Sequence, residues 1–226
     1  MVKRNKSPNE VAVRWGGALG GFVLAGALLY AFPFIHIVPL DGAGRESRQF
    51  DPKAYAEEFW TQRLPAVLNR AVDIKTLFAA IQDDPESAKA KHATTLGIGD
   101  VYYYFVSGKG RVGAIGSDSF SVHVVNTEEP DVVIKTSHIF GNAIRNGTNL
   151  IDVNEFPNSK DFNRISAEIN RIVENRVIPP ILNELSVGNR IQFVGCAEIV
   201  NEESDLTPLC IVPVRLEILS SGVAAK

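Results

Sequence analysis

The sequence is poor in cysteine and histidine and lacks the motifs of several large enzyme classes. Two cysteines among 226 residues cannot build a disulfide scaffold or a four-thiolate zinc site. The four histidines show neither HExxH nor HxH spacing, and no GxSxG nucleophile elbow occurs. We therefore predict no catalytic residue, no metal site and no cofactor, and we interpret the protein as a non-enzyme.

Positive charge is also scarce. The formal net charge is -3, and part of the basic charge stands close to the N-terminus. Four of the 23 basic residues but only one of the 26 acidic residues precede position 41, which leaves 19 basic and 25 acidic side chains. An acidic domain does not seek phosphate backbones, so we expect no nucleic-acid partner.

One long uncharged run stands near the N-terminus. Residues 15–40 contain no Asp, Glu, Lys or Arg, and about 20 apolar residues are enough to cross a bilayer as a helix. A cleaved signal peptide is the alternative, but no small-x-small cleavage site is evident. The basic residues ahead of the run predict a cytoplasmic N-terminus and a globular domain on the other side of the membrane; they are Lys3, Arg4, Lys6 and Arg14.

Helical and extended patterns follow one another along the rest of the chain. Asp-Pro or Asp N-cap signatures predict helices that begin after Asp51, Asp73 and Asp84. Apolar alternation predicts strands from residue 101 onward, with a turn at 107–110, and a long helix over 160–185. The expected strands cover residues 101–106, 111–115, 120–125, 131–136, 190–200 and 209–219.

This order predicts an α+β protein with an N-terminal transmembrane helix, followed by helices packed on a small, partly open β-barrel. The barrel would resemble an oligonucleotide/oligosaccharide-binding (OB) fold. We divide the chain into a cytoplasmic stub and anchor (1–40), a tether (41–50), an α+β domain (51–220) and a loose tail (221–226).

One segment between the expected strands and the long helix is unusually rich in polar side chains. Residues 138–158 combine an arginine with several asparagines, whose side chains can hydrogen-bond sugar hydroxyls or a partner's backbone. The same residue types also form caps and turns, so both interpretations remain open. The candidate ligand- or partner-binding residues are Arg145, Asn146, Asn154, Phe156 and Asn158.

The two cysteines lie on the last two expected strands. Strand alternation assigns Cys196 to the face opposite Phe193, and Cys210 to the same inward face as Val212. Side chains on opposite faces do not reach disulfide geometry, so we predict no bond between them.

Several short motifs, in order along nearly the whole chain, resemble a family of uncharacterised bacterial proteins described as predicted periplasmic lipoproteins. They are residues 32–41, 50–52 with Tyr55 and Trp60, 108–112, 141–145, 156–158 and 188–195. The resemblance implies a bacterial envelope protein associated with sugar-type ABC transport systems, of unknown molecular activity. Many relatives carry a lipid-modified cysteine near residues 29–31, where this chain has none.

We therefore expect a single-pass protein of the bacterial inner membrane with a periplasmic domain. Its expected role is that of a non-enzymatic accessory protein, working with a sugar-type ABC transporter or its substrate-binding protein. The alternative is a periplasmic module that binds a small, sugar-like ligand.

Overall fold

The computed structural model describes residues 50–96, 100–125, 131–156 and 158–219. The described residues belong to a compact unit that begins at Phe50. The expected anchor and the tether up to Gln49, together with the tail, lie outside the described residues. Within the described ranges, no helix has both the length and the apolar character that crossing a bilayer requires.

The first third of the described domain is helical, as its aspartate caps predict. Asp51 accepts hydrogen bonds from the backbone N–H groups of Lys53 and Ala54 at 3.0 and 3.1 Å. Asp73 and Asp84 cap the next two helices in the same way. The helical elements are α2 (Pro52–Glu58), the π-helical turn η2 (Phe59–Arg63), the 3-10 segment η3 (Leu64–Arg70), α3 (Ile74–Asp83) and α4 (Pro85–His92).

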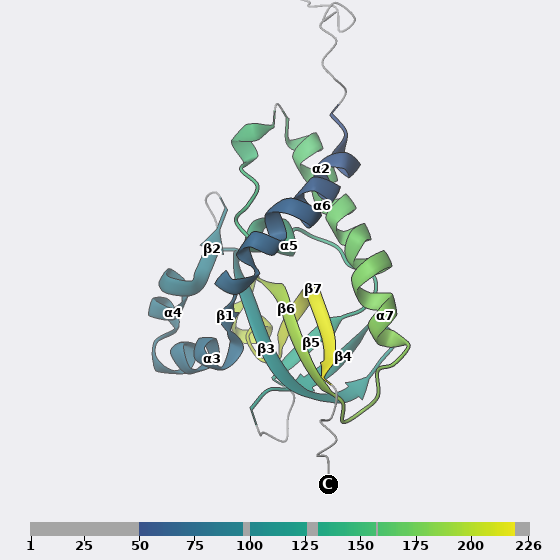
Figure 1. Ribbon diagram of the computed structural model, residues 1–226. Helices are drawn as coiled ribbons and strands as arrows, with labels where there is room; N and C mark the ends of the chain where they lie inside the picture. The colour runs from purple at the N-terminus through teal and green to yellow at the C-terminus, as the bar shows by residue number, and fades with distance from the viewer. Residues whose placement is uncertain (1–49, 97–99, 126–130, 157, 220–226) are drawn as a thin grey trace, which may run out of the picture. The chain divides into compact units, whose positions relative to one another are not determined.

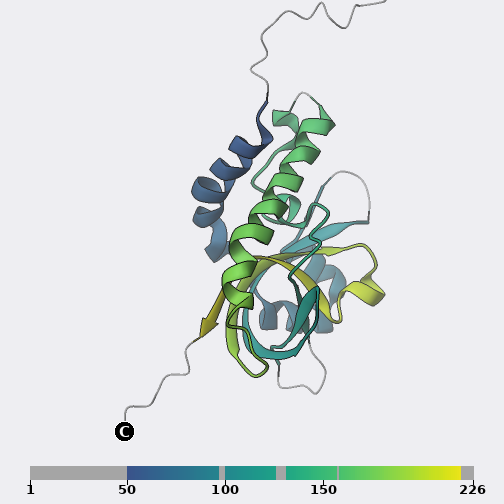
Figure 2. The ribbon, with the colours of Figure 1, turned by 90° about the vertical axis from the view of Figure 1, so that its right-hand side faces the viewer.

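Five strands form a ring of hydrogen-bonded pairs (Figure 2). The order is β3-β4-β5-β7-β6, and β6 pairs again with β3, so the circuit returns to its first strand. Within this ring, only the β5–β7 pair is parallel. The short strands β1 (Val72–Asp73) and β2 (Ala93–Thr95) pair with β3. The ring strands are β3 (Tyr102–Ile115), β4 (Ser119–His123), β5 (Val132–Lys135), β6 (Arg190–Ile199) and β7 (Leu209–Leu219).

The turn expected at residues 107–110 is wrong, because β3 runs through this segment without a break. The glycines there allow close packing instead of a reversal. A Cβ at Gly108 would lie 2.6 Å from a ring carbon of Phe193, and a Cβ at Gly110 would lie 2.5 Å from Val122 Cγ1. Glycine in a strand often marks such a close approach rather than a turn.

The long helix expected over 160–185 forms, with two irregularities. Asn158 caps α6 by accepting a hydrogen bond from the backbone N–H of Asp161 at 2.9 Å. The helical path continues through a π-helical turn before Pro179 and Pro180 enter the last short helix. Its parts are α6 (Ser159–Ile172), η5 (Val173–Val177) and α7 (Ile178–Leu182).

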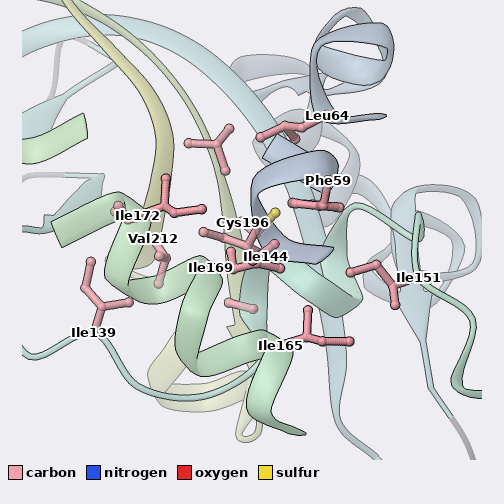
Figure 3. Packing of buried hydrophobic residues seen from close by; sticks show 14 of the residues in the cluster. Phe59, Leu64, Ile139, Ile144, Ile151, Ile165, Ile169, Ile172, Cys196 and Val212 are labelled. Atoms are coloured by element: carbon pink, nitrogen blue, oxygen red, sulfur yellow. The ribbon is translucent and has the colours of Figure 1, made fainter. Parts of the chain in front are cut away.

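The ring separates two apolar cores. The first fills the ring interior, where Tyr102, Tyr104 and Phe193 pack with Ile74 and Leu77 of α3. The second lies between the outer face of β6 and β7 and a layer made by α2, α5 (Ala143–Gly147) and α6. Figure 1 shows α2 beside α6, and Figure 3 shows the side chains that fill this second core around Cys196 and Val212.

Both cysteines are free thiols. Cys196 is fully buried against the helices and pairs in register with Val212, whereas Cys210 pairs with Val133 of β5. The inward face expected for Val212 is wrong, because its side chain belongs to the helix-facing core, as does that of Val214. A register shift between Val194 and Gly195 changes the alternation along this strand pair.

Replacing Gly195 tests how tightly β6 and β7 pack. A Cβ there would lie 2.5 Å from the backbone oxygen of Val212, so Gly195→Ala should lower the free energy of unfolding by about 3 kcal/mol. Gly188→Ala is the matched control, because Gly188 has φ +88° but a Cβ added there would meet no atom within 4 Å. That change should cost about 1 kcal/mol. Urea unfolding of the full-length chain in mild detergent measures both values, and equal costs would contradict the tight contact.

Candidate functional site

The polar segment singled out in the sequence contributes much of the buried polarity of the domain. It contains α5, all of whose residues are buried, and the 3-10 turn η4 (Val153–Glu155). Among the described residues, six polar side chains are buried, and all but Thr136 lie on or directly after α5 or on α6: Arg145, Asn146, Thr148, Ser166 and Asn170.

Helix α5 sits unusually close to strand β6. A Cβ at Gly147 would lie 2.9 Å from Cys196 Sγ, so a side chain at this position would push the helix away from the strand. Thr148 ends the helix and its hydroxyl donates to the carbonyl of Ile144 at 2.8 Å. The glycine thereby allows Arg145 and Asn146 to be buried between the sheet and α6.

Arg145 is the only arginine or lysine among the buried residues of the described chain, and its exposed fraction is 4%. Its Nε donates to Asn146 Oδ1 at 2.9 Å, and its Nη1 donates to the carbonyl oxygen of Phe162 at 3.0 Å and to Asn163 Oδ1 at 3.2 Å. The guanidinium also lies 3.7 Å from the centroid of the Phe162 ring. These acceptors are neutral, so the buried charge is held by dipoles and by an aromatic face.

Burial lowers the pKa of Arg145 to about 10, and the nearby Tyr103 and Glu198 partly offset that effect. Because the charged form is still favoured below that value, the guanidinium stays protonated through the neutral range. The cost of burying the charge is therefore constant across neutral pH and would be relieved only as the pH rises beyond about 10.

Tyr103 joins this group to strand β6. Its hydroxyl donates to Glu198 Oε1 at 3.2 Å, and it shares a hydrogen bond with the side chain of Asn146. Burial raises the pKa of Tyr103, so it remains a neutral donor. The four aromatic side chains of residues 102–105 are all buried. They therefore belong to the protein interior, and Tyr103 also belongs to the hydrogen-bond network of Arg145.

The structure joins Arg145 and Asn146 in one network and places Phe156 against Phe162, whose ring contacts Arg145. The other two candidates serve local structure. Asn154 bonds Asp152 at the start of η4, and Asn158 caps α6. Phe156 packs against Phe50, Tyr55 and Phe162 at ring-centroid distances of 5.3 to 5.5 Å. Each of the five candidates thus has a structural contact, and a ligand role for them stays a prediction.

A pocket opens beside this network, between residues 139–142 and helix α6, with a volume of about 340 Å³. The loop is fixed to the helix at two points. The backbone N–H of Ile139 donates to Glu174 Oε1 at 3.0 Å, and Asn170 Nδ2 donates to the carbonyl of Gly141 at 3.1 Å. Gly141 adopts φ +87°, which favours glycine.

The pocket wall combines polar and apolar groups, and one exposed aromatic lies beside it. Asn142, Asn163, Ser166 and Asn170 line it, and Phe140 is 75% exposed. Our prediction from the sequence missed the three residues on α6. Positions 163, 166 and 170 have the three- and four-residue spacing of one helix face. This polar stripe, beside the apolar stripe of the same helix, is the sequence signal that would have identified the three pocket residues.

Titratable groups also meet on the surface, where Arg63 contacts Tyr55, Glu58 and Glu155. Within the described ranges, no group of three or more His, Cys, Asp or Glu side chains is placed to hold a metal ion. His138 has φ 50°, and its Nδ1 lies 3.7 Å from Asp118 Oδ1. The pocket beside α6 is therefore the candidate binding site of the described domain.

A comparison with protein families gives a match over residues 24–217, which is most of the chain. The family is described as "Predicted periplasmic lipoprotein (DUF2291)". The chain belongs to this family. The resemblance drawn from its motifs is thereby confirmed, and the family description indicates the bacterial envelope as its location. No curated protein matches the chain significantly.

Among solved structures, this member of the family is similar to an OB-fold protein from Thermotoga maritima, known from a crystal structure. The TM-score is 0.69 at 31% sequence identity, and the match covers 75% of this chain and 99% of the other. The expected OB-type architecture is therefore confirmed, and the strand order of the ring agrees with it.

Replacing Arg145 tests the buried network. Arg145→Ala leaves three acceptors without their donor and opens a cavity, so it should lower the free energy of unfolding by about 3–5 kcal/mol. Arg145→Met, which fills most of the volume, should cost about 2 kcal/mol. Urea unfolding of the full-length chain measures both.

The control is Arg164→Ala on α6, the helix against which Arg145 packs. Arg164 is half-exposed and its nitrogen lies 3.6 Å from Asp161 Oδ1, so its loss should cost less than about 1 kcal/mol. If Arg145→Ala cost no more than this control, the buried arginine would not hold α5 to α6.

Proposed function

We propose that this protein is a membrane-anchored, non-enzymatic accessory protein of the bacterial cell envelope. Its OB-type domain would lie in the periplasm and contact a sugar-type ABC transporter or that transporter's substrate-binding protein. The observation that supports this proposal most is the family match over residues 24–217, because it concerns a family described as periplasmic.

The positions of the cysteines support a helical anchor instead of a lipid. A lipid anchor needs a cysteine near the N-terminus, but Cys196 and Cys210 lie in strands β6 and β7. Cys196 has no exposed surface, and burial raises the pKa of its thiol. The uncharged run at residues 15–40, preceded by basic residues, is the segment of this sequence suited to anchoring.

The buried polar residues of α5 make hydrogen bonds to other groups of the domain, which supports a binding role over a catalytic one. Arg145 and Asn146 are occupied by neighbouring groups, and the acidic domain disfavours nucleic acid and anionic lipid as partners. A protein partner reaches the domain through its exposed surface, where large apolar side chains are the best contact residues. The three most exposed of these are Phe140, Val187 and Val200.

Site-specific crosslinking in native membranes tests the accessory role. A photoreactive amino acid at Phe140, Val187 or Val200 should attach subunits of the transporter or its substrate-binding protein from at least one position. The same probe at Lys109, which is exposed and polar, is the control for random encounters. Products are identified by mass spectrometry of the membrane fraction.

Two outcomes would contradict the proposal. One is the absence of transport components from every position while the protein is present in the membrane fraction at its normal level. The other is unchanged uptake and unchanged transporter assembly after deletion of the gene.

A second candidate function is the binding of a small, sugar-like ligand in the periplasm. The observation that favours it is the polar pocket beside residues 139–142, and not the exposed residues Asn154 and Asn158. Phe140 belongs to both candidates, but Val187 and Val200 report on partner docking alone, and ligand titration reports on sugar binding, so the two functions are separable by experiment.

A further inference from the structure

We propose that the pocket between residues 139–142 and α6 binds a small, uncharged, polyhydroxylated ligand of the size of a single sugar ring. In this arrangement Phe140 contacts the apolar face of the ring, and amide and hydroxyl groups of Asn142, Asn163, Ser166 and Asn170 exchange hydrogen bonds with its hydroxyls. The inference deepens the second candidate function, on which it rests, by assigning it a site and a ligand class.

The first argument is an unsatisfied hydroxyl in the pocket wall. Ser166 is 5% exposed, and its Oγ is the one buried side-chain nitrogen or oxygen of the described residues that has no hydrogen-bond partner. A serine in a helix commonly bonds the carbonyl four residues earlier. Here that carbonyl, of Phe162, accepts a hydrogen bond from Arg145 and none from Ser166. The oxygen has almost no exposed surface, so rotation of the Ser166 side chain towards the pocket would let a ligand hydroxyl supply the missing partner.

The second argument is the hydrogen-bonding capacity that the amides retain. Each asparagine side chain has two donors and two acceptor lone pairs. Asn163 uses its oxygen to accept from Arg145, and Asn170 uses one N–H to donate to Gly141, so each keeps further capacity. Sugar hydroxyls both donate and accept, which matches a wall of amides better than a wall of charges would.

The third argument is the charge of the wall. Arg171 lies 2.7 Å from Glu168 in an ion pair, and Glu174 already accepts the N–H of Ile139. The wall therefore offers no uncompensated cation for an anionic ligand, and the negative charge that Glu174 retains would repel one. An uncharged ligand fits this balance.

The fourth argument is the way the aromatic is presented. The bonds of Ile139 to Glu174 and of Gly141 to Asn170 fix the backbone on both sides of Phe140, whose side chain nevertheless remains 75% exposed. Pre-organisation of this kind reduces the entropy cost of binding. The volume of about 340 Å³ lies near the lower end for ligand pockets, which limits the ligand to one ring.

Binding to the full-length protein in mild detergent tests the proposal, with D-glucose, D-galactose, D-ribose, D-xylose and myo-inositol as probes. Saturation-transfer NMR detects contact, and thermal unfolding measures a saturable rise in Tm. At least one probe should bind, and Phe140→Ala or Asn142→Ala should weaken it about tenfold or more. Val187→Ala, which removes a similarly exposed apolar side chain elsewhere, should leave the affinity unchanged.

Ser166→Ala separates a ligand contact from a structural one. Removing an unpartnered buried hydroxyl should raise the Tm of the ligand-free protein by about 2–4 °C and still weaken the sugar. A lower Tm in the ligand-free variant would show that the hydroxyl serves the fold, which would contradict the first argument.

Charged analogues test the ligand class. D-Glucuronate and glucose 6-phosphate should bind more weakly than the uncharged probe, and tighter binding of either would overturn the assignment. So would the absence of saturable binding by all five probes, or equal affinity in Phe140→Ala. Because partner docking is read from crosslinking, positive crosslinking with no sugar binding would overturn the pocket and leave the accessory role standing.

Discussion

The burial of Arg145 between α5, α6 and the strand ring is the constraint on which the helical side of this domain depends. A charged guanidinium with 4% exposure is costly unless every neighbour is arranged around it. The neighbours here are a carbonyl and an amide from α6, an amide from α5 and an aromatic face. This arrangement fixes the relative positions of α5 and α6.

Helix α6 is the common support of the network and of the pocket. Its residues Phe162 and Asn163 hold Arg145, while Asn170 and the following Glu174 hold the loop at Gly141 and Ile139. The buried apolar face of the same helix packs in the core shown in Figure 3. One helix therefore couples the outer face of the strand ring to the candidate ligand pocket.

Local signals made much of the fold predictable. Asp51, Asp73 and Asp84 mark helix starts because their carboxylates satisfy backbone N–H groups of the first turn. The last strand, Leu209–Leu219, has the bounds that alternation and flanking residues predict. The error at residues 107–110 arose because glycine signals both turns and close packing, and only the long-range partners Ile74, Phe193 and Val122 decide between them.

The candidate site was predicted only in part, for a physical reason. Polar residues in one segment show that hydrogen bonds are needed there, but they do not show whether the partners are internal. Arg145 and Asn146 found internal partners, whereas Phe140 and Asn142 of the same segment line a pocket completed by α6. Residues that are distant in sequence, such as Ser166 and Asn170, join the site only through the tertiary packing of that helix.

Native-state hydrogen exchange of full-length Arg145→Met protein tests the central claim, that the buried arginine holds α5 and the pocket loop to α6. The account predicts that the amides of Ile139, Asn146 and Thr148 lose protection relative to the unsubstituted protein. The amide of Leu209, which bonds Asp131 at the ring, should keep its protection. Unchanged exchange at α5 and the loop, or an equal loss at Leu209, would contradict the account.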